Sequence, residues 1–357
     1  MPSLVIRDQQ PLAELTSLEL GGPAEHFTVI DDRAQLFDAL DWAAQKAQAI
    51  TILGGGSNVI VSDRGVPGLV LRMQTHGIEI TATSELIAQA GEAWDGVVAR
   101  SVDEGLAGLE CLSGIPGQVG ATPIQNVGAY GQEIANCLRA VEVLDRSTRQ
   151  IAWLAAEDCE FAYRTSRFKR EPDRHVVLAV RFGLARAPAA TPRYPELANA
   201  LAAISGSPSL DHVRAAVLAL RRAKSMLIET DDENRRSVGS FFLNPIVTAL
   251  QADDVAMRAR SLGLIGSNDA MPRYPQARGR QKLSAAWLIE KSGTRKGERV
   301  GGVGISTRHS LALVHHGGAS TADLVEFAEA IRARVRNAFQ IELVPEPVPL
   351  GFSRAPF

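Results

Sequence analysis

Five segments of the chain carry residues whose types and spacing could do chemistry. The first is Gly54-Gly55-Gly56-Ser57-Asn58, which follows a short apolar run. Consecutive glycines let backbone N–H groups converge on an anion such as a phosphate, because no Cβ blocks close approach. The segment lacks the last glycine of a Rossmann fingerprint and is not followed by the Lys-Ser/Thr of a Walker A loop. A phosphate cradle and a plain glycine-rich turn therefore both stay open.

The second segment is a long, uncharged, glycine-punctuated stretch over residues 113–131. Such loops are uncommon inside a globular domain unless they perform a task. The small residues would let a flat ligand lie against the backbone, while Thr122, Gln125 and Asn126 could hydrogen-bond its edge. This composition favours a ligand wall over an internally packed Ω-like loop.

The third segment, Phe161–Arg170, interleaves aromatic residues with the cations Arg164, Arg167, Lys169 and Arg170. Such a pattern suits an anionic small molecule or RNA. The formal net charge is −2, with 38 basic against 40 acidic residues, so the chain has no overall basic field for nucleic acid or an anionic membrane. We therefore expect a small anion, met by locally placed cations.

The fourth and fifth segments place a hydroxyl and a carboxylate in stiff or water-excluding surroundings. In Ser237–Pro245, Gly239 frees the backbone beside Ser240, and two phenylalanines follow. Phenylalanine at position 242 excludes a G-x-S-x-G nucleophile elbow. Glu346 stands between two prolines after an expected strand, so its backbone is stiff. Taken alone, a serine in the position of Ser240 is more often a hydrogen-bonded residue at the edge of a core strand than a catalytic group. A lone glutamate such as Glu346 is more often an exposed carboxylate.

The cysteines and histidines do not form a metal-binding pattern. Cys111, Cys137 and Cys159 lie far apart, with no C-x-x-C, so we expect reduced core thiols, as in a cytoplasmic protein. The pair His315-His316 has no recognisable third ligand nearby. No metal is expected.

No segment of the sequence is typical of a signal peptide or of a membrane-spanning helix. Arg7 and Asp8 leave no room for the apolar run of a signal peptide. The longest charge-free stretch, Cys111–Gln132, is broken by glycines and prolines and could not satisfy its backbone in lipid as one helix. We expect a soluble cytoplasmic protein.

The elements around these segments indicate a mixed fold. At 357 residues the chain exceeds the roughly 250–300 at which one core stops growing, so we expect two or three domains. Strands are expected over Glu25–Ile30, Ile50–Leu53, Val59–Val61, Leu69–Leu71, Leu86–Ala90, Leu138–Asp145, Gln150–Leu154 and Val176–Leu184. Helices are expected after Asp31 or Asp32 and over Trp94–Glu104, Leu197–Ile204, Asp211–Lys224 and Thr321–Phe339. The proline-rich segment Ala185–Pro195 indicates a linker or mobile loop, and a last strand is expected near Ile341–Val344.

Together and in this order, the segments resemble the UDP-N-acetylenolpyruvoylglucosamine reductases (UDP-N-acetylmuramate dehydrogenases, the MurB family). The resemblance runs from about Leu18 to Gly351. It rests on GGGSN, SGIPG with G-x-x-P-I-Q-N-x-G-A-Y-G, F-x-Y-R-T-S, G-S-F-F-x-N-P and P-E-P. The GGGSN motif is weak alone, but the combination is highly specific.

The resemblance implies an α+β fold, with a vanillyl-alcohol-oxidase or PCMH-type FAD-binding domain of two lobes and an α+β substrate-binding domain. We expect the first lobe in residues 1–73 with 340–357 returning to it, the second in 74–217 and the substrate-binding domain in 218–339. Members of the family bind FAD non-covalently and take hydride from NADPH. They reduce the enolpyruvyl ether of UDP-N-acetylglucosamine enolpyruvate to UDP-N-acetylmuramate in bacterial peptidoglycan synthesis. The expected partner is this UDP-sugar, with no obligate protein partner, nucleic acid or membrane insertion.

The resemblance also assigns site residues. Arg164, Ser240 and Glu346 match the catalytic positions. The FAD-contacting positions would be Gly54, Gly55, Gly56, Ser57, Asn58, Ser113, Gly114, Ile115, Pro116, Gly117, Gly120, Ala121, Thr122, Ile124, Gln125 and Asn126. The substrate-binding positions would be Tyr163, Tyr194, Lys224 and Asn244. Tyr194 resembles a tyrosine of the subclass with a longer loop, although Pro195 follows it where glycine is expected.

Two other functions compete with this one. An alcohol oxidase of the same fold would commonly attach FAD through histidine, and residues 54–58 and 113–131 contain none. A nucleotide-sugar-binding regulator without activity would not need Arg164, Ser240 and Glu346 together, and all three are present.

Overall fold

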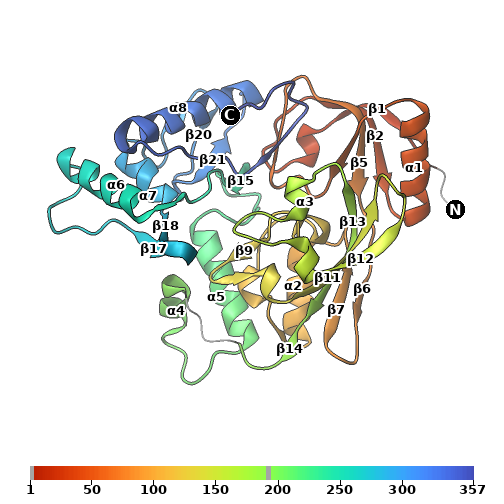
Figure 1. The fold of residues 1–357 in the computed structure, drawn as a ribbon, viewed down its shortest axis with the longest axis horizontal. Coiled ribbons are helices and arrows are strands. Elements are labelled where there is room, and N and C mark those ends of the chain that lie inside the picture. The colour runs from red at the N-terminus through yellow and green to blue at the C-terminus, as the bar shows by residue number, and fades with distance from the viewer. Residues whose placement is uncertain (1–3, 190–193) are drawn as a thin grey trace. The chain divides into compact units, whose positions relative to one another are not determined.

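The computed structural model describes residues 4–189 and 194–357, which form two compact units. Unit 1 contains Met1–Gln10, Ala24–Gly56 and Pro67–Leu227. Unit 2 contains Pro11–Pro23, Ser57–Val66 and Ile228–Phe357. Helices are mixed with mostly antiparallel strands, which is the expected α+β class (Figure 1). The finer division into two lobes and a substrate-binding domain stays a prediction.

One sheet of unit 1 has four strands in the order β1-β2-β5-β3. They are β1 (Arg7–Pro11), β2 (Pro23–Ile30), β3 (Ile50–Leu53) and β5 (Val66–Met73). Helix α1 (Arg33–Gln45) begins after Asp32, whose side chain accepts a hydrogen bond from the Gln35 amide. Its apolar stripe packs against apolar residues of β2 and β5, as its helical spacing predicts.

The second sheet of unit 1 is antiparallel, with five strands in the order β12-β11-β13-β7-β6. They are β6 (Ile78–Ile80), β7 (Glu85–Gln89), β11 (Leu138–Asp145), β12 (Ile151–Ala155) and β13 (His175–Gly183). Helix α2 (Trp94–Asp103) packs against this sheet through the buried Trp94, which contacts Phe182. The strands expected here are confirmed, and the short edge strand β6 was not predicted.

The charge-free stretch is folded into short turns rather than one long element. It holds 3₁₀ helices at Glu110–Leu112 and Val119–Ala121, and it leads into the hairpin of β9 (Gly128–Ala129) and β10 (Gln132–Glu133). A further 3₁₀ helix, Ile134–Asn136, follows. Across the described residues, no helix combines the length and apolar character that crossing a membrane requires.

The expectation of a linker over Ala185–Pro195 is wrong at its start. Ala185–Arg186 forms strand β14, which pairs antiparallel with β8 (Leu106–Ala107). The pairing partner lies far away in sequence, so the local proline content does not reveal it. Residues 190–193, all four of which belong to the expected loop, lie outside the described residues. The remaining elements of unit 1 are a 3₁₀ helix at Ala156–Cys159, α3 (Arg167–Arg170), α4 (Pro195–Leu201) and α5 (Leu210–Ala223).

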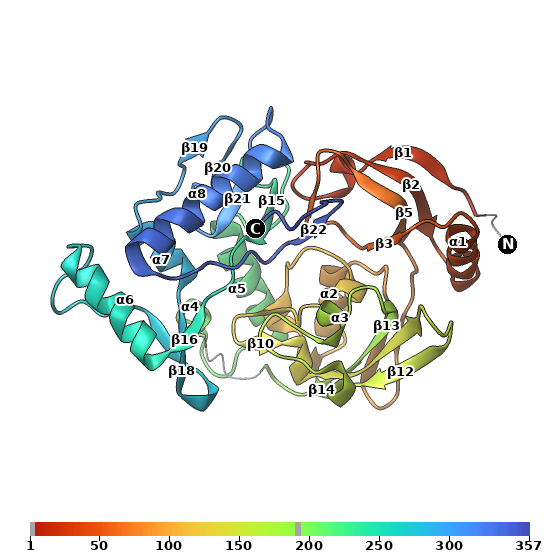
Figure 2. The same ribbon diagram turned by 45° about the horizontal axis from the view of Figure 1, so that its top comes forward.

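Unit 2 is built around helix α8 (Thr321–Phe339) and the sheet of order β15-β21-β20-β19 (Figure 2). These strands are β15 (Ser237–Ser240), β19 (Arg299–Val300), β20 (Val303–Ile305) and β21 (Ala312–His315). A smaller sheet contains β16 (Ile246–Thr248), β17 (Arg273–Pro275) and β18 (Arg280–Leu283), with helices α6 (Ala249–Ser261) and α7 (Ala285–Lys291). Helix α8 begins and ends where its periodicity predicts, with the expected capping box of Ser320 and Asp323.

The last strand falls later than expected. Residues 341–344 form no strand, and β22 (Val348–Leu350) instead pairs in parallel with β4 (Val59–Val61). The segment before it is held by single contacts, such as the bridge between Pro345 and Phe242. Two prolines interrupt the possible ladder, because proline has no N–H to donate.

The three cysteines are free, buried thiols, as expected. Burial raises the pKa of Cys111, Cys137 and Cys159 to about 12 in each case. A thiol with so high a pKa carries almost no thiolate at neutral pH, so all three serve as packing residues.

The start of α8 depends on a carboxylate from the loop after β4, and this generates a prediction. Asp63 accepts hydrogen bonds from the backbone amides of Thr321 (2.7 Å) and Ala322 (2.9 Å). Replacing Asp63 by alanine leaves two donors at the positive end of the helix without their anion, so we expect a loss of about 1–2 kcal/mol in unfolding free energy. Urea denaturation should show this, while Glu326→Ala, on the exposed face of the same helix, should change stability by less than about 0.5 kcal/mol. Equal stabilities for the two variants would contradict the role of Asp63.

Candidate active site

Gly54 and Gly55 of the Gly54–Asn58 segment close against another glycine turn of unit 1. A Cβ on Gly55 would lie 2.9 Å from Cα of Gly117, and one on Gly54 would lie 3.3 Å from Oε1 of Gln118. Gly56 has φ +65°, a conformation that side chains disfavour. The turn therefore needs glycine for close backbone approach, which is the geometry of a cradle for an extended ligand. Ser57 and Asn58 belong to unit 2.

Gln118 is a buried side chain beside this turn that the motif analysis did not single out. Its Nε2 donates to the carbonyl oxygens of Met73 (3.1 Å) and Gly91 (3.0 Å). Its Oε1 is buried and has no hydrogen-bond partner in the structure. Because a buried acceptor without a donor is costly, this oxygen marks a place where a ligand N–H or O–H fits.

The Ser113–Gly117 loop is fixed from both sides by charged residues of two helices. The Gly114 amide donates to Oδ1 of Asp95 (2.6 Å), and the Gly114 carbonyl accepts from Nε of Arg221 (3.1 Å). Asp95 is also held by a two-point ion pair with Arg214, at 2.7 and 2.8 Å. A Cβ on Gly114 would lie 2.5 Å from Cδ2 of Leu227, so the loop backbone packs directly on its neighbours.

The Gly120–Gly131 loop and the F-x-Y-R-T-S motif form one structural unit. Ser166 donates through Oγ to the Ile124 carbonyl (2.6 Å), and Asn126 donates through Nδ2 to the Ala162 carbonyl (3.2 Å). Ala162 and Thr165 exchange backbone hydrogen bonds, so Arg164 lies in a tight turn, with φ +53°. The two motifs that look separate in the sequence therefore position each other.

The Arg164 guanidinium is directed by backbone carbonyls of that loop. Its Nη1 donates to the Asn126 carbonyl at 3.3 Å, and its Nη2 donates to the Gly128 carbonyl at 2.5 Å. The guanidinium carbon lies 5.7 Å from the centre of the Tyr163 ring. An arginine held in this way presents a permanent positive charge in a defined direction, which suits a carboxylate or a growing negative charge.

Several predicted cofactor-contacting side chains turn into their own loop. The hydroxyl of Ser113 donates to the Glu110 carbonyl (2.7 Å), and that of Thr122 donates to the Val119 carbonyl (2.8 Å). Both amide hydrogens of Asn126 are used, by Ala162 and by Oε2 of Glu133 (2.8 Å). These residues shape the loop, so contact with a ligand would come mainly from the backbone. Their assignment to a cofactor stays a prediction.

Tyr194 and Lys224, both predicted to bind substrate, meet around Tyr130 in unit 1. The Tyr194 and Tyr130 rings pack edge to face at 5.4 Å, and Nζ of Lys224 lies 6.0 Å from the centre of the Tyr130 ring. Lys224 also forms an ion pair with Glu196 (2.5 Å) at the start of α4. Burial raises the pKa of Tyr130 to about 12, so its hydroxyl stays protonated. The structure thus brings these residues together, without testing their role.

Ser240 and Glu346 lie on neighbouring backbone segments of unit 2. Gly239 has φ +73°, and the pairing of β15 with β21 shifts register between Ser237 and Ser240. Such a bulge redirects the side chain that follows it. The Glu346 amide donates to the Phe241 carbonyl (2.9 Å), which places the glutamate beside the residue next to Ser240. Arg164, the third predicted catalytic residue, belongs to unit 1.

The remaining predicted residue, Asn244, supports a helix. Its Oδ1 accepts a hydrogen bond from the Ala285 amide (2.9 Å) at the start of α7. Elsewhere in unit 2, Arg235 and Arg236 both form ion pairs with Glu19. Burial alone would raise the Glu19 pKa, but these two arginines lower it overall, so Glu19 is ionised at neutral pH.

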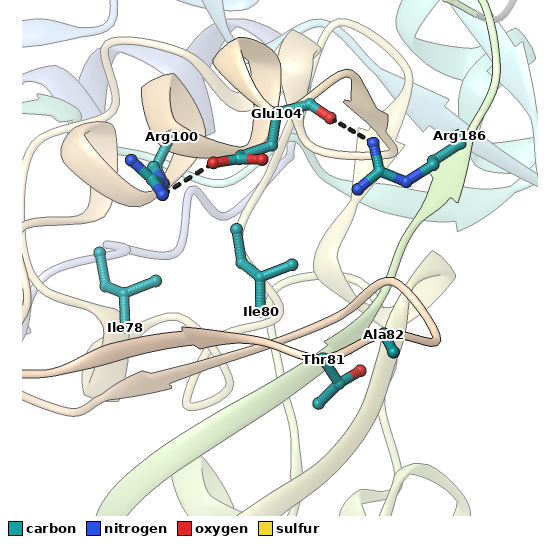
Figure 3. Close-up of a pocket in the computed structure, with 7 residues that line it drawn as sticks. All are labelled: Ile78, Ile80, Thr81, Ala82, Arg100, Glu104 and Arg186. Carbon is teal, nitrogen blue, oxygen red and sulfur yellow. Dashed lines mark hydrogen bonds and ion pairs between the residues drawn. The ribbon is translucent and has the colours of Figure 1, made fainter.

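Two hollows in the described surface contain none of the predicted site residues. The larger, about 560 Å³, lies in unit 1 between β6 and the end of α2 (Figure 3). Its rim arginines are engaged with Glu104: Arg100 pairs with the carboxylate at 2.7 Å, and Arg186 donates to the carbonyl at 3.0 Å. The other hollow, about 360 Å³, lies in unit 2 beside His315 and His316.

The residues that sequence reasoning missed are those that hold the loops. Asp95, Arg214 and Arg221 fix the Ser113–Gly117 turn, and Glu133 binds Asn126. Each is a single charged residue in an ordinary helical or turn pattern, so the sequence carries no signal for it. Gln118 lies within the 113–131 segment, and its place between Gly117 and Gly120 was the available signal.

The anchoring of the Ser113–Gly117 turn predicts a pH-dependent stability difference. Burial alone would raise the Asp95 pKa, but the hydrogen bonds from Arg214 and the Gly114 amide lower it overall. The ionised carboxylate thus stabilises the fold above its unfolded pKa of about 4, and this contribution is lost as the pH falls through the folded pKa. Asp95→Asn should lower stability at pH 7 by about 1 kcal/mol, a modest value because the carboxylate is half-exposed. Thermal melts from pH 7 down to pH 3 should show that the difference in melting temperature between Asp95→Asn and the unmodified protein narrows below about pH 4. A difference that does not change with pH would contradict the role of the ion pair.

The sequence of the chain matches two family models. Residues 24–152 match an FAD binding domain, and residues 231–350 match the C-terminal domain of UDP-N-acetylenolpyruvoylglucosamine reductase. The first match confirms the expected type of FAD-binding domain. The FAD-binding model covers the Gly54–Gly56 turn and β11, and the C-terminal reductase model covers Ser240 and Glu346.

Relatives with this enzyme name are similar over nearly their whole length. The reductase of Thermobifida fusca is 47% identical over 348 residues, covering 96% of this chain and 97% of that protein. The reductase of Streptomyces avermitilis is 45% identical over 344 residues, covering 96% and 94%. The crystal structure of UDP-N-acetylenolpyruvylglucosamine reductase from Thermus caldophilus matches with a TM-score of 0.67 at 25% identity, covering 98% of this chain and 100% of that one. This extent of similarity shows that the chain belongs to the UDP-N-acetylenolpyruvoylglucosamine reductase family.

Proposed function

We propose that the chain is an NADPH-dependent flavin reductase. It reduces the enolpyruvyl ether of UDP-N-acetylglucosamine enolpyruvate to the lactyl ether of UDP-N-acetylmuramate, a step of peptidoglycan synthesis. The observation that carries the proposal is the carbonyl-held Arg164 guanidinium, in a chain of this family whose Ser240 and Glu346 are both present. The UDP-sugar substrate and the reduced thiols favour a cytoplasmic location.

The residues of unit 1 fit FAD. The close approach of Gly54 and Gly55 to the Gly117 turn leaves backbone rather than side chains facing a diphosphate, and the partnerless Oε1 of Gln118 can accept a hydrogen bond from the cofactor. When bound, FAD takes a hydride from NADPH and passes it to the substrate. Residues 54–58 and 113–131 contain no histidine, so we expect the flavin to be held without a histidyl bond and to be released by acid precipitation.

Arg164 stabilises the negative charge that develops on the substrate. Hydride addition to the β-carbon of the enol ether leaves charge on the α-carbon and its carboxylate. A guanidinium stays protonated and can bind a carboxylate through two N–H groups, and its orientation is already set by the Asn126 and Gly128 carbonyls. Such preorganised stabilisation acts most strongly in the transition state.

Ser240 supplies the proton that the α-carbon of the substrate receives, and Glu346 orients the substrate. The Ser240 hydroxyl gives its proton to the α-carbon, which completes the new C–H bond, and the serine regains a proton from solvent. A hydroxyl is a weak acid, so the transfer requires a strongly basic carbanion within hydrogen-bond reach. Glu346 is fixed by its backbone bond to Phe241 and by its flanking prolines, so its carboxylate acts from a defined position.

The substrate's diphosphate calls for cations and its sugar for aromatic and amide groups. Lys224 supplies the cation, and Tyr163, Tyr194 and Asn244 supply the other contacts. The ion pair of Lys224 with Glu196 holds the ammonium near Tyr130 before substrate arrives.

Separating the two half-reactions tests the assigned roles. In Ser240→Ala, flavin reduction by NADPH should stay within about threefold of the unmodified protein, while reoxidation by the UDP-linked enol ether should slow by about 10²–10⁴-fold. Stopped-flow absorbance of the flavin measures both steps. Equal losses in the two steps would exclude Ser240 as the proton donor, and a purified protein that binds no flavin would exclude the proposed function.

The glycine turn predicts a specific defect in cofactor affinity. An added methyl in Gly55→Ala meets the Gly117 backbone at 2.9 Å, so the two turns must separate, and we expect FAD to bind at least about tenfold more weakly. Gly96→Ala, in α2, is the control, since its Cβ meets only another Cβ at 4.0 Å. Fluorescence titration of the apoprotein with FAD compares the two. Unchanged affinity in Gly55→Ala would show that the turn does not contact the cofactor.

A further inference from the structure

The guanidinium of Arg164 is held by a backbone whose own position depends on one side chain. The two carbonyls that it binds belong to Asn126 and Gly128, on the loop that leads into the β9–β10 hairpin. Asn126 is 1% exposed and has φ +47°, in the left-handed region that asparagine enters more readily than most other residues. The orientation of Arg164 therefore depends on what holds Asn126.

The Asn126 side chain connects three backbone segments. Its Oδ1 accepts from the Ala135 amide (3.2 Å), and its Nδ2 donates to the Ala162 carbonyl in the Arg164 turn and to Oε2 of Glu133 (2.8 Å). Two of these partners are backbone groups that substitution does not change. Glu133 is the side-chain partner, so it is the position at which the arrangement can be altered.

Glu133 is itself fixed in the same hairpin. Its backbone pairs with Gly128 across β9–β10, and its amide donates a hydrogen bond to Oδ1 of Asn136 (2.9 Å). A Cβ on Gly128 would lie 2.7 Å from Cγ of Glu133 and 3.1 Å from Nη1 of Arg164. The glutamate chain, the glycine and the guanidinium are therefore packed against one another, with no room for a side chain at position 128.

We propose that Glu133 is a positioning residue for the reductive step: its carboxylate fixes the Asn126 amide, and through it both the carbonyl that Arg164 binds and the turn that carries Arg164. This inference rests on the proposed function, in which Arg164 stabilises the charge that develops on the substrate. It separates Glu133 from cofactor reduction, because NADPH delivers its hydride without needing that charge to be stabilised.

The test compares three substitutions of Glu133 in the full-length holoenzyme. Glu133→Met keeps the chain length but removes the oxygen that accepts from Asn126, Glu133→Ala removes the chain, and Glu133→Gln keeps an acceptor oxygen. We expect the first two to slow flavin reoxidation by the UDP-linked enol ether by about 10²-fold, since small displacements of a reacting group have effects of this size. Flavin reduction by NADPH should stay within about twofold, and Glu133→Gln should stay within about threefold in both steps. Glu133→Met keeps the test decisive if Glu133→Ala does not fold.

Two further measurements separate positioning from a general loss of structure. Glu79→Met, on the exposed edge strand β6, makes the same chemical change away from the loop and should leave both steps unchanged. In an Arg164→Gln background, Glu133→Met should slow reoxidation by no more than about twofold further, because residues that act through one group are not additive.

The outcomes distinguish this inference from the function on which it rests. The positioning role would be overturned by any of three results. Glu133→Met could be reoxidised at the unmodified rate, or Glu133→Gln could be reoxidised as slowly as Glu133→Met. In the Arg164→Gln background, Glu133→Met could slow reoxidation by the same factor as it does alone. Failure of the enol ether to reoxidise the unmodified holoenzyme, or an Arg164→Gln variant as fast as the unmodified one, would overturn the proposed function and this inference with it.

Discussion

The two hydrogen bonds from the Arg164 guanidinium to main-chain carbonyls are the interaction on which the proposed chemistry depends. A carbonyl oxygen cannot change its charge or rotamer, so it directs the guanidinium without neutralising it. The two carbonyls set the direction in which the guanidinium presents its charge, and a fixed direction is what electrostatic stabilisation of a transition state requires.

That arrangement explains why the surrounding loop is so poor in reactive side chains. Gly114, Gly120 and Gly128 lie where an added Cβ would come within 3 Å of a neighbouring group. The loop can approach its neighbours closely only because these side chains are missing. Its Ser113 and Thr122 hydroxyls bind the loop's own backbone, and its Asn126 amide binds the Ala162 carbonyl of the Arg164 turn. The charged residues that fix it, such as Asp95, attach from helices outside the motif. The loop is thus a shaped backbone surface, and its shape, not its side-chain chemistry, suits a flat cofactor.

Periodicity predicted the long elements and failed on the short ones. Helix α8 and strand β11 have the predicted ends because each repeats its apolar pattern over many residues. Strands β8 and β14 have two residues each, too few for a period, and they exist because they pair across a large sequence separation. The same limit applies to the site: motifs identified Arg164 and Ser240, whereas Glu133 becomes meaningful only once folding brings it to Asn126. Isolated carboxylates carry no local signal of the group they will hold.

The backbone conformations of Arg164 and Asn126 show how the site tolerates local strain. Both are non-glycine residues with positive φ, which costs roughly 1 kcal/mol or more at each position. Glycine at either position would relieve the strain but would remove the guanidinium or the amide that links three segments. The strain is offset by the paired backbone bonds of Ala162 and Thr165 and by the bond of Ser166 to Ile124, which lie on both sides of the turn. A turn held at both ends cannot relax to a lower-energy conformation without breaking several hydrogen bonds at once, so the strained form is also the rigid one. Rigidity is what a preorganised cation needs, and this accounts for the arginine standing where local sterics alone would favour glycine.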